Sequence, residues 1–293
     1  MTNTWFEPIE QSFHLATQAG DNVANWLWVV KHDCGFDDLR NQWLKTQMCH
    51  HDKETCACHC SSCQLFPHHP DILIQGEDQT IGVDAIRLGI TQIMRKPTVS
   101  RHRIWVLVVH QAMTTAAMNA LLKVLEEPPA YAKIILMTED EHTLLATIKS
   151  RLVSWRMPLV MDVDAVYQWM SVEHPSLDHQ YFKALYYASS YRPYTVKQWL
   201  DDDKVIPVLS FFQQWLSNDS AIVLNGMCKE DYFIYLLNGF QYLCWQSIRQ
   251  GTSINRCHEA YRITQNIRSD YEGMVKLHRP LLMQQWCHQL AEV

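Results

Sequence analysis

Two apolar runs in the first half of the chain restrict its possible folds most strongly. Trp105 to Val109 and Ile134 to Met137 are hydrophobic at every position, without the alternation of a strand that has one face in water. Strands that are apolar on both faces are typical of a parallel sheet with helices on both sides. We therefore expect these two strands in the middle of such a sheet.

Three further β-rich runs surround these two, and stretches with helical periodicity separate all of them. The expected strands are residues 25–30, 71–74, 104–109, 133–138 and 153–157. This alternation predicts an α/β fold with a five-stranded parallel sheet. The best defined helix follows the third strand, because Thr114 or Thr115 can cap its start and Pro128-Pro129 stops it.

The second half of the chain has a different pattern. From about residue 162 the strand signal fades and aromatic-rich helical segments follow, with breaks near residues 174–176, 191–193 and 201–203. We expect an α/β core over residues 1–160, a small helical domain over 161–204 and an all-α domain over 205–293. The aromatic residues of the last domain are expected mainly in its core, with some of them instead at apolar interfaces between subunits. A base-stacking platform is the disfavoured alternative, because it lacks basic surroundings. These residues are Phe211, Phe212, Trp215, Tyr232, Phe233, Phe240, Tyr242 and Trp245.

Charge and hydropathy disfavour two classes of protein. The formal net charge of −6 argues against a protein that coats nucleic acid by neutralising phosphates. The longest apolar runs are about six residues, far short of the roughly 20 that cross a bilayer, so no membrane contact is expected. The first residues lack a basic stretch followed by an apolar segment, and we expect the cytoplasm.

Cysteines are concentrated in one short segment. Five of them occur within about residues 49–63, namely Cys49, Cys56, Cys58, Cys60 and Cys63. Tetrahedral zinc takes four ligands, and the C-x-x-C spacing of Cys60 and Cys63 lets both bind one ion from a tight turn. We expect a structural Zn²⁺ held by four of the five. The spacing leaves open whether Cys56 or Cys58 completes the set, with His59 a weaker candidate; the alternative is a group of ordinary buried or redox-sensitive thiols.

The loop after the first expected strand lacks the parts of a nucleotide site. A phosphate loop needs flexible glycines, a lysine for the terminal phosphates and a Ser or Thr for magnesium. Residues 31–38 read Lys-His-Asp-Cys-Gly-Phe-Asp-Asp, and none of the nine glycines in the chain precedes a lysine. The end of the third strand, residues 108–111, has no carboxylate to order magnesium. We therefore expect no bound ATP and no ATPase activity from this chain by itself.

One long motif carries a family resemblance. Residues 119–129, Asn-Ala-Leu-Leu-Lys-Val-Leu-Glu-Glu-Pro-Pro, resemble the NALLKxLEEPP motif of bacterial clamp-loader AAA+ subunits. His69-Pro70-Asp71, residues 81–87 and residues 147–151 support it in order, so that the resemblance covers about residues 20–160. It implies an AAA+ core that carries a zinc module, followed by a helical lid and a C-terminal collar domain.

Delta-prime subunits, one branch of this family, commonly lack a phosphate loop, and this chain resembles them in lacking it. The resemblance implies a non-hydrolysing stator subunit of the DNA polymerase III clamp loader, which helps to load the sliding clamp onto primed DNA. The implied partners are the ATPase subunits (gamma/tau) and a delta subunit, with the clamp and primer–template DNA reached through the complex. The alternatives are an active clamp-loader ATPase and a stand-alone zinc-dependent DNA-binding protein, which the net acidity disfavours.

The resemblance also implies roles for single residues. Ser150 and Arg151 match the first two residues of the family's Ser-Arg-Cys motif, and Leu152 replaces the cysteine. In the family this arginine reaches into the ATP site of a neighbouring subunit, so Arg151 is the expected arginine finger, with Ser150 beside it. Arg192 falls where active relatives sense phosphate, and it is expected to be structural here.

Overall fold

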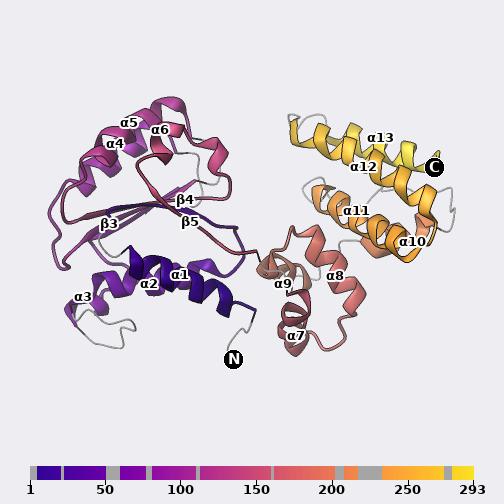
Figure 1. The fold of residues 1–293 in the computed structure, drawn as a ribbon, viewed down its shortest axis with the longest axis horizontal. Coiled ribbons are helices and arrows are strands. Elements are labelled where there is room, and N and C mark those ends of the chain that lie inside the picture. The colour runs from indigo at the N-terminus through magenta and orange to yellow at the C-terminus, as the bar shows by residue number, and fades with distance from the viewer. Residues whose placement is uncertain are drawn as a thin grey trace. The chain divides into compact units, whose positions relative to one another are not determined.

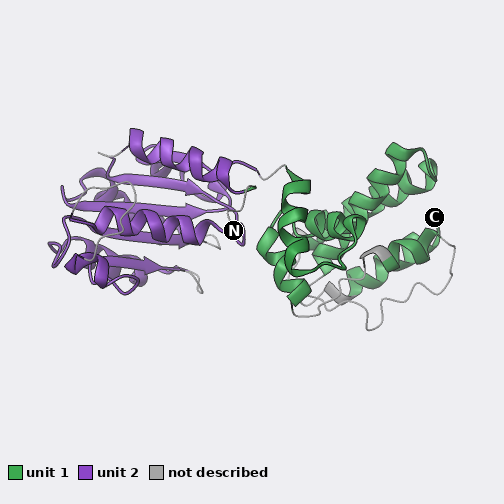
Figure 2. Ribbon diagram, turned by 90° about the horizontal axis from the view of Figure 1, so that it is seen from below, with its two compact units in different colours: residues 1–5, 160–293 green, residues 6–159 purple. Residues whose placement is uncertain are grey.

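The chain forms two compact units, coloured separately in Figure 2. One consists of residues 6–159, and the other of residues 160–293 with the first five residues. The computed structural model describes residues 5–20, 23–50, 60–76, 81–109, 113–159, 162–201, 208–216, 233–273 and 279–293. The predicted division into 1–160, 161–204 and 205–293 stays a prediction.

A five-stranded parallel sheet, with strand order β2-β3-β4-β1-β5, is the centre of the first unit. Its strands are β1 (Asn25–Val29), β2 (Ile72–Gln75), β3 (Arg103–Val109), β4 (Ala132–Thr138) and β5 (Val153–Arg156). Every predicted strand is confirmed to within one residue at each end. The two apolar runs became β3 and β4, which pair with each other inside the sheet.

Helices cover both faces of this sheet, as Figure 1 shows. On one face lie α1 (Glu7–Ala19) and α2 (Phe36–Met48), and on the other lie α4 (Val83–Ile93), α5 (Thr115–Glu126) and the short α6 (Ala146–Lys149). A single turn, α3 (Ser61–Gln64), follows the cysteine segment, and a 3₁₀ turn, η1 (Glu141–Thr143), follows β4. The prediction for α5 is confirmed: Thr114 Oγ1 accepts a hydrogen bond from Ala117 N–H at 3.2 Å, and the helix ends just before Pro128.

The two faces of the sheet bury different kinds of side chain. Towards α4 and α5 the core is mainly aliphatic, with Leu107, Leu136 and Leu121 almost fully buried around Trp105. Towards α1 and α2 it is aromatic, and the contacting rings are Phe13, Trp28, Phe36, Trp43 and Trp155. Each of these large side chains contributes roughly 1.5–3 kcal/mol by leaving water. This burial stabilises the sheet from which the loops at its edges extend.

The second unit is helical throughout its described residues. Its helices are α7 (Val163–Glu173), α8 (His179–Ala188), α9 (Pro193–Asp201), α10 (Val208–Leu216), α11 (Phe233–Gln250), α12 (Ile254–Gly273) and α13 (Arg279–Ala291). The first two predicted breaks fall between α7 and α8 and between α8 and α9. The third begins at Asp201, the last residue of α9, and residues 202–203 lie outside the described part of the chain. No described helix has the length and apolar character that a membrane crossing requires.

An aromatic core holds the second unit together, largely as predicted. Five of the expected core residues are buried: Phe211, Phe212, Trp215, Phe233 and Phe240. Tyr242 is half-buried, and Tyr232 lies outside the described residues. The prediction is wrong for Trp245, which is 43% exposed. Trp245 lies one helical turn from Arg249 on α11, and the guanidinium carbon covers the ring at 4.8 Å from its centroid.

Candidate functional site

Three of the five candidate zinc ligands lie together. The Sγ atoms of Cys49, Cys60 and Cys63 are all within 4.8 Å of one another. Zinc–sulfur bonds of about 2.3 Å in a tetrahedron place the sulfurs roughly 3.8 Å apart, so the three thiols are close to the spacing that one ion needs. Cys49 and Cys63 are buried and Cys60 is partly exposed. The other two candidates, Cys56 and Cys58, and the weaker candidate His59 lie outside the described residues.

Local backbone structure presents the thiols from two segments. Helix α2 ends at Met48, and Cys49 follows in an extended conformation. Cys60 caps the start of α3, where its Sγ accepts a hydrogen bond from Cys63 N–H at 3.5 Å. A hydrogen bond donated to sulfur favours the thiolate, which is the form that binds a metal. The donor set therefore fits a soft divalent cation such as zinc.

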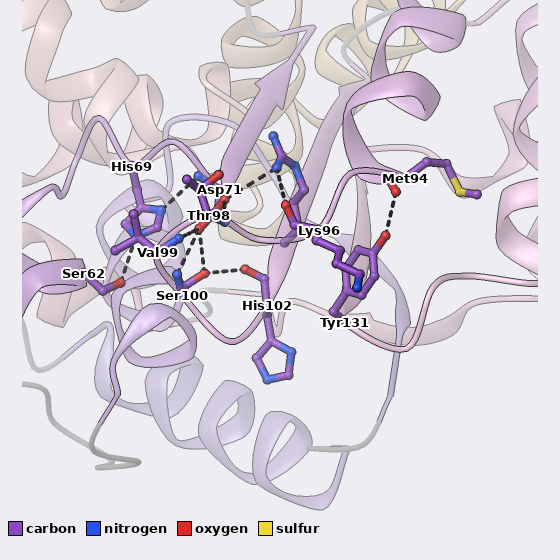
Figure 3. A network of polar contacts seen from close by, with 11 residues as sticks. Ser62, His69, Asp71, Met94, Lys96, Thr98, Val99, Ser100, His102 and Tyr131 are labelled. Atoms are coloured by element: carbon purple, nitrogen blue, oxygen red, sulfur yellow. Dashed lines mark hydrogen bonds and ion pairs between the residues drawn. The ribbon is translucent and has the colours of Figure 1, made fainter.

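Ser62 connects the two cysteine-bearing segments, and Figure 3 shows its contact with His69. This fully buried serine lies between Cys60 and Cys63, and its Oγ donates to the carbonyl oxygen of Met48 at 2.7 Å. The same Oγ lies 2.8 Å from Nε2 of His69, which is also buried. One hydroxyl thus joins the end of α2, the turn α3 and the segment that leads into β2.

Asp71 accepts several of the hydrogen bonds in this network. Its carboxylate is fully buried and accepts hydrogen bonds from the backbone N–H groups of Thr98, Val99 and Ser100 at 2.7, 2.8 and 3.0 Å. Arg103 Nη1 lies 3.5 Å away. Burial by itself raises the pKa of Asp71, but the hydrogen bonds, led by that from Ser100, outweigh burial and hold the pKa below its ordinary value. Asp71 is therefore a carboxylate that secures the turn before β3 to the start of β2 (Figure 3).

The loop after β1 binds a carboxylate of the chain itself through a backbone N–H group. His32 N–H donates to Glu139 Oε1 at 2.7 Å, and Glu139 follows the carboxyl end of β4. Asp33 has φ +54° and Gly35 has φ +76°, so the loop turns sharply before α2 begins. A phosphate loop offers its backbone N–H groups to an anion, whereas here one such group already binds an internal anion. The predicted loss of phosphate binding at this loop stays a prediction.

Arg151 lies just after α6, with its side chain about one third exposed. Its Nη1 donates to Thr147 O at 2.6 Å and contacts Ser150 Oγ at 3.3 Å. Its Nη2 lies 2.5 Å from Oε1 of Glu126 at the end of α5. The guanidinium is thus held between two of the motifs that carried the family resemblance. Its expected role toward a neighbouring subunit stays a prediction, as does the structural role of Arg192.

The sequence did not identify the polar residues that organise the cysteine cluster and the loop after β1. Neither Ser62 nor Glu139 was singled out, because a serine in a C-x-x-C turn and a glutamate after a strand are common on surfaces. Asp71 was noted only as part of a motif. The available signal was a carboxylate directly ahead of an apolar strand, where burial requires hydrogen-bond partners.

Comparison with known proteins identifies the relatives of the first unit. The family model for the DNA polymerase III delta subunit matches residues 7–160, just over half of the 293 residues. The delta-prime subunit of Escherichia coli (strain K12) is 31% identical over 153 residues, which are 50% of this chain and 46% of that protein. The delta-prime subunit of Buchnera aphidicola (subsp. Schizaphis graminum) is 29% identical over 161 residues, 53% of this chain and 45% of that protein.

Two further relatives extend the comparison. The DNA polymerase III gamma/tau subunit of Mycobacterium tuberculosis (strain H37Rv) is 35% identical over 150 residues, 50% of this chain and 26% of that protein. The crystal structure of a DNA polymerase III gamma subunit-related protein from Thermotoga maritima aligns with 96% of this chain and 99% of that chain. Its TM-score is 0.50 at 16% identity, which is a likeness of fold. The chain spans about half the length of the delta-prime subunits it matches.

Proposed function

The chain belongs to the DNA polymerase III delta subunit family, and we propose that it is a non-hydrolysing stator subunit of a DNA polymerase III clamp loader. The observation that carries this proposal is the match over residues 7–160, which takes in the whole parallel sheet and its covering helices. As a delta-prime subunit it would assemble with gamma/tau ATPase subunits and a delta subunit in the cytoplasm. The sliding clamp and primed DNA would be reached through that complex.

Two features of the loop after β1 support the absence of hydrolysis. Gly35 in this loop is followed by Phe36 instead of the lysine of a phosphate loop, and residues 31–38 include no Ser or Thr. The Glu139 carboxylate, hydrogen-bonded to His32 N–H at 2.7 Å, adds a negative charge where a triphosphate would need positive ones. The first feature removes groups that bind phosphate and magnesium, and the second adds repulsion of the triphosphate.

The proposed contribution to catalysis is the guanidinium of Arg151, delivered to the ATP site of a neighbouring subunit. An arginine stabilises charge on the transferred phosphoryl group by charge-assisted hydrogen bonds. The side chain is 32% exposed, so it is within reach of a partner. Ser150 and Thr147 accept hydrogen bonds from Nη1 and orient the guanidinium. The finger therefore acts in trans, while the chain that supplies it hydrolyses nothing.

The cysteine cluster is proposed to hold one structural Zn²⁺. Cys49, Cys60 and Cys63 supply three thiolates, and Cys56 or Cys58 supplies the fourth. A tetrahedral site closed by four protein ligands has no open position for water or substrate, so its role is to crosslink the chain. We further propose that the sheet unit is an AAA+ core, that residues 161–204 form a lid, and that residues 205–293 form the collar that joins the subunits.

Reconstitution tests the proposal directly. The full chain is mixed with purified gamma/tau, delta and clamp proteins of a bacterial polymerase III and separated by size-exclusion chromatography, and ATP binding by the isolated chain is measured by titration calorimetry. The proposal predicts a stable complex and no ATP binding. Sub-millimolar ATP affinity would instead favour an active ATPase. Salt-dependent DNA binding by the lone chain, without assembly, would favour a separate DNA-binding protein.

A further inference from the structure

We infer that Ser62 and His69 are positioning residues for the thiol cluster. Their hydrogen bonds connect the segments that hold the metal ligands to the edge of the sheet. This inference rests on the proposed zinc site and concerns residues that donate nothing to the metal. Figure 3 shows the chain of contacts that carries it, from Ser62 through His69 to Asp71 and the turn formed by Thr98, Val99 and Ser100.

The first link joins the two ligand segments to each other. Met48 immediately precedes Cys49, and Ser62 lies between Cys60 and Cys63. The 2.7 Å hydrogen bond from Ser62 Oγ to Met48 O therefore sets the separation of these segments independently of any metal. A site whose ligands are already in place loses less conformational entropy when it binds an ion.

In the second link, the geometry determines which atom donates each hydrogen bond. Asp71 N–H donates to Nδ1 of His69 at 3.1 Å, so Nδ1 carries no proton and the ring proton is on Nε2. Nε2–H then donates to Ser62 Oγ at 2.8 Å, and the hydroxyl in turn donates a hydrogen bond to Met48 O at 2.7 Å. The imidazole must be neutral for this sequence to exist. Burial, the largest cause, lowers the pKa of His69 and is consistent with that state.

The third link ties His69 to the sheet. Asp71, whose N–H orients the imidazole, is held by three backbone N–H groups of residues 98–100 and leads directly into β2. The sheet continues from there, since Ile104 N–H at the start of β3 donates to Asp71 O at 2.9 Å. Ser62 is 0% exposed and His69 is 3% exposed, so water does not replace either partner when one is removed.

Removal of the Ser62 hydroxyl would therefore leave two buried polar atoms without their partner, Met48 O and His69 Nε2. The ligand segments would then be free to separate, and the metal would leave faster. Loss of groups that orient metal ligands typically weakens binding by roughly 10- to 100-fold. Ser61 offers a matched control, because it precedes Ser62 in the same turn but is exposed.

The experiment compares zinc release from three full-length proteins: the native chain, Ser62→Ala and Ser61→Ala. Transfer of zinc to the chelator 4-(2-pyridylazo)resorcinol is followed by absorbance. We expect release at least roughly 10-fold faster from Ser62→Ala and unchanged from Ser61→Ala. Equal rates for the two serine variants would overturn the inference. A native protein without zinc would remove the metal proposal itself, which is a distinguishable outcome.

A second set of measurements separates positioning from a general loss of stability. Melting temperatures are recorded for each protein with and without zinc, and the cobalt(II)-loaded forms are compared by absorption spectroscopy. Positioning predicts that Ser62→Ala reduces the gain in melting temperature on zinc binding while cobalt keeps its thiolate charge-transfer bands. An equal drop with and without metal would contradict it. If Ser62→Ala does not fold, the same melting temperatures and cobalt spectra are recorded for His69→Gln. This variant keeps an N–H donor but loses the Nδ1 acceptor.

Discussion

Arg151 Nη2 and Glu126 Oε1 lie 2.5 Å apart and join the end of α5 to the residue that follows α6. The two side chains are 32% and 50% exposed. Because exposed ion pairs are worth roughly 0–1 kcal/mol, Glu126 holds the guanidinium only weakly. If Arg151 is the finger proposed above, a triphosphate in a neighbouring subunit would replace Glu126 as its partner, because the triphosphate carries more charge than one carboxylate.

Neutralising Glu126 should hardly change stability. Glu126→Gln keeps the size of the side chain and removes its charge, so the unfolding free energy should fall by less than about 1 kcal/mol. Urea unfolding followed by circular dichroism measures the change. Glu127→Gln is the control, because Glu127 is exposed and its side chain has no ion pair with the residues that the structure describes. A loss well above that of the control would show that the ion pair is a structural element rather than an exchangeable contact.

A glycine in α4 should not tolerate even one methyl group. A Cβ on Gly89 would lie 2.1 Å from Cζ2 of the fully buried Trp105, whose Nε1 is fixed by a hydrogen bond to Gln75 Oε1 at 2.9 Å. Although alanine is normally favoured over glycine in a helix, Gly89→Ala should lower the unfolding free energy by about 1–3 kcal/mol. Gly82→Ala is the matched control, since nothing lies within 4 Å of its added Cβ. Equal melting temperatures for both variants would contradict the packing described for this face.

Acidification should weaken the first unit through His69. Burial lowers the pKa of His69 from its ordinary 6.5 in the folded chain, so the unfolded chain takes up this proton at the higher pH. Stability therefore falls as the pH drops below the unfolded value of about 6.5. Metal-free protein should unfold at a lower urea concentration at pH 5.5 than at pH 8, and His69→Gln should show a smaller difference. An identical pH dependence in both proteins would mean that His69 titrates normally.

The fold was largely predictable because its strands are unambiguous. Trp105 to Val109 and Ile134 to Met137 are buried on both faces. Their uninterrupted apolar sequence was enough to predict this burial without any knowledge of tertiary contacts. Thr114 and Pro128 likewise mark the limits of α5 by local chemistry. Trp245 was misplaced because an aromatic ring covered by Arg249 on a helix surface has the same sequence signal as a buried one.

The organisation of the site was less predictable for a physical reason. The ligand pair Cys60 and Cys63 is local and could be identified from spacing. The network around Asp71 joins this residue to residues 98–104, and it exists only once β2 and β3 have paired. Glu139 meets His32 over 107 positions in the same way. Such contacts form only when the strands pair into the sheet, and no local sequence pattern specifies this pairing.

The most direct test of the account is the ATPase rate of a reconstituted clamp loader that contains Arg151→Ala in this chain. Arg156→Ala is the control, because Arg156 is also exposed and paired with a carboxylate, that of Glu141, at 2.7 Å. DNA- and clamp-stimulated hydrolysis is measured after size-exclusion chromatography has confirmed assembly. If Arg151 is an arginine finger, hydrolysis at the neighbouring site should fall by roughly 10³-fold, while the control keeps the native rate. An intact complex whose ATPase rate does not change with Arg151→Ala would contradict it.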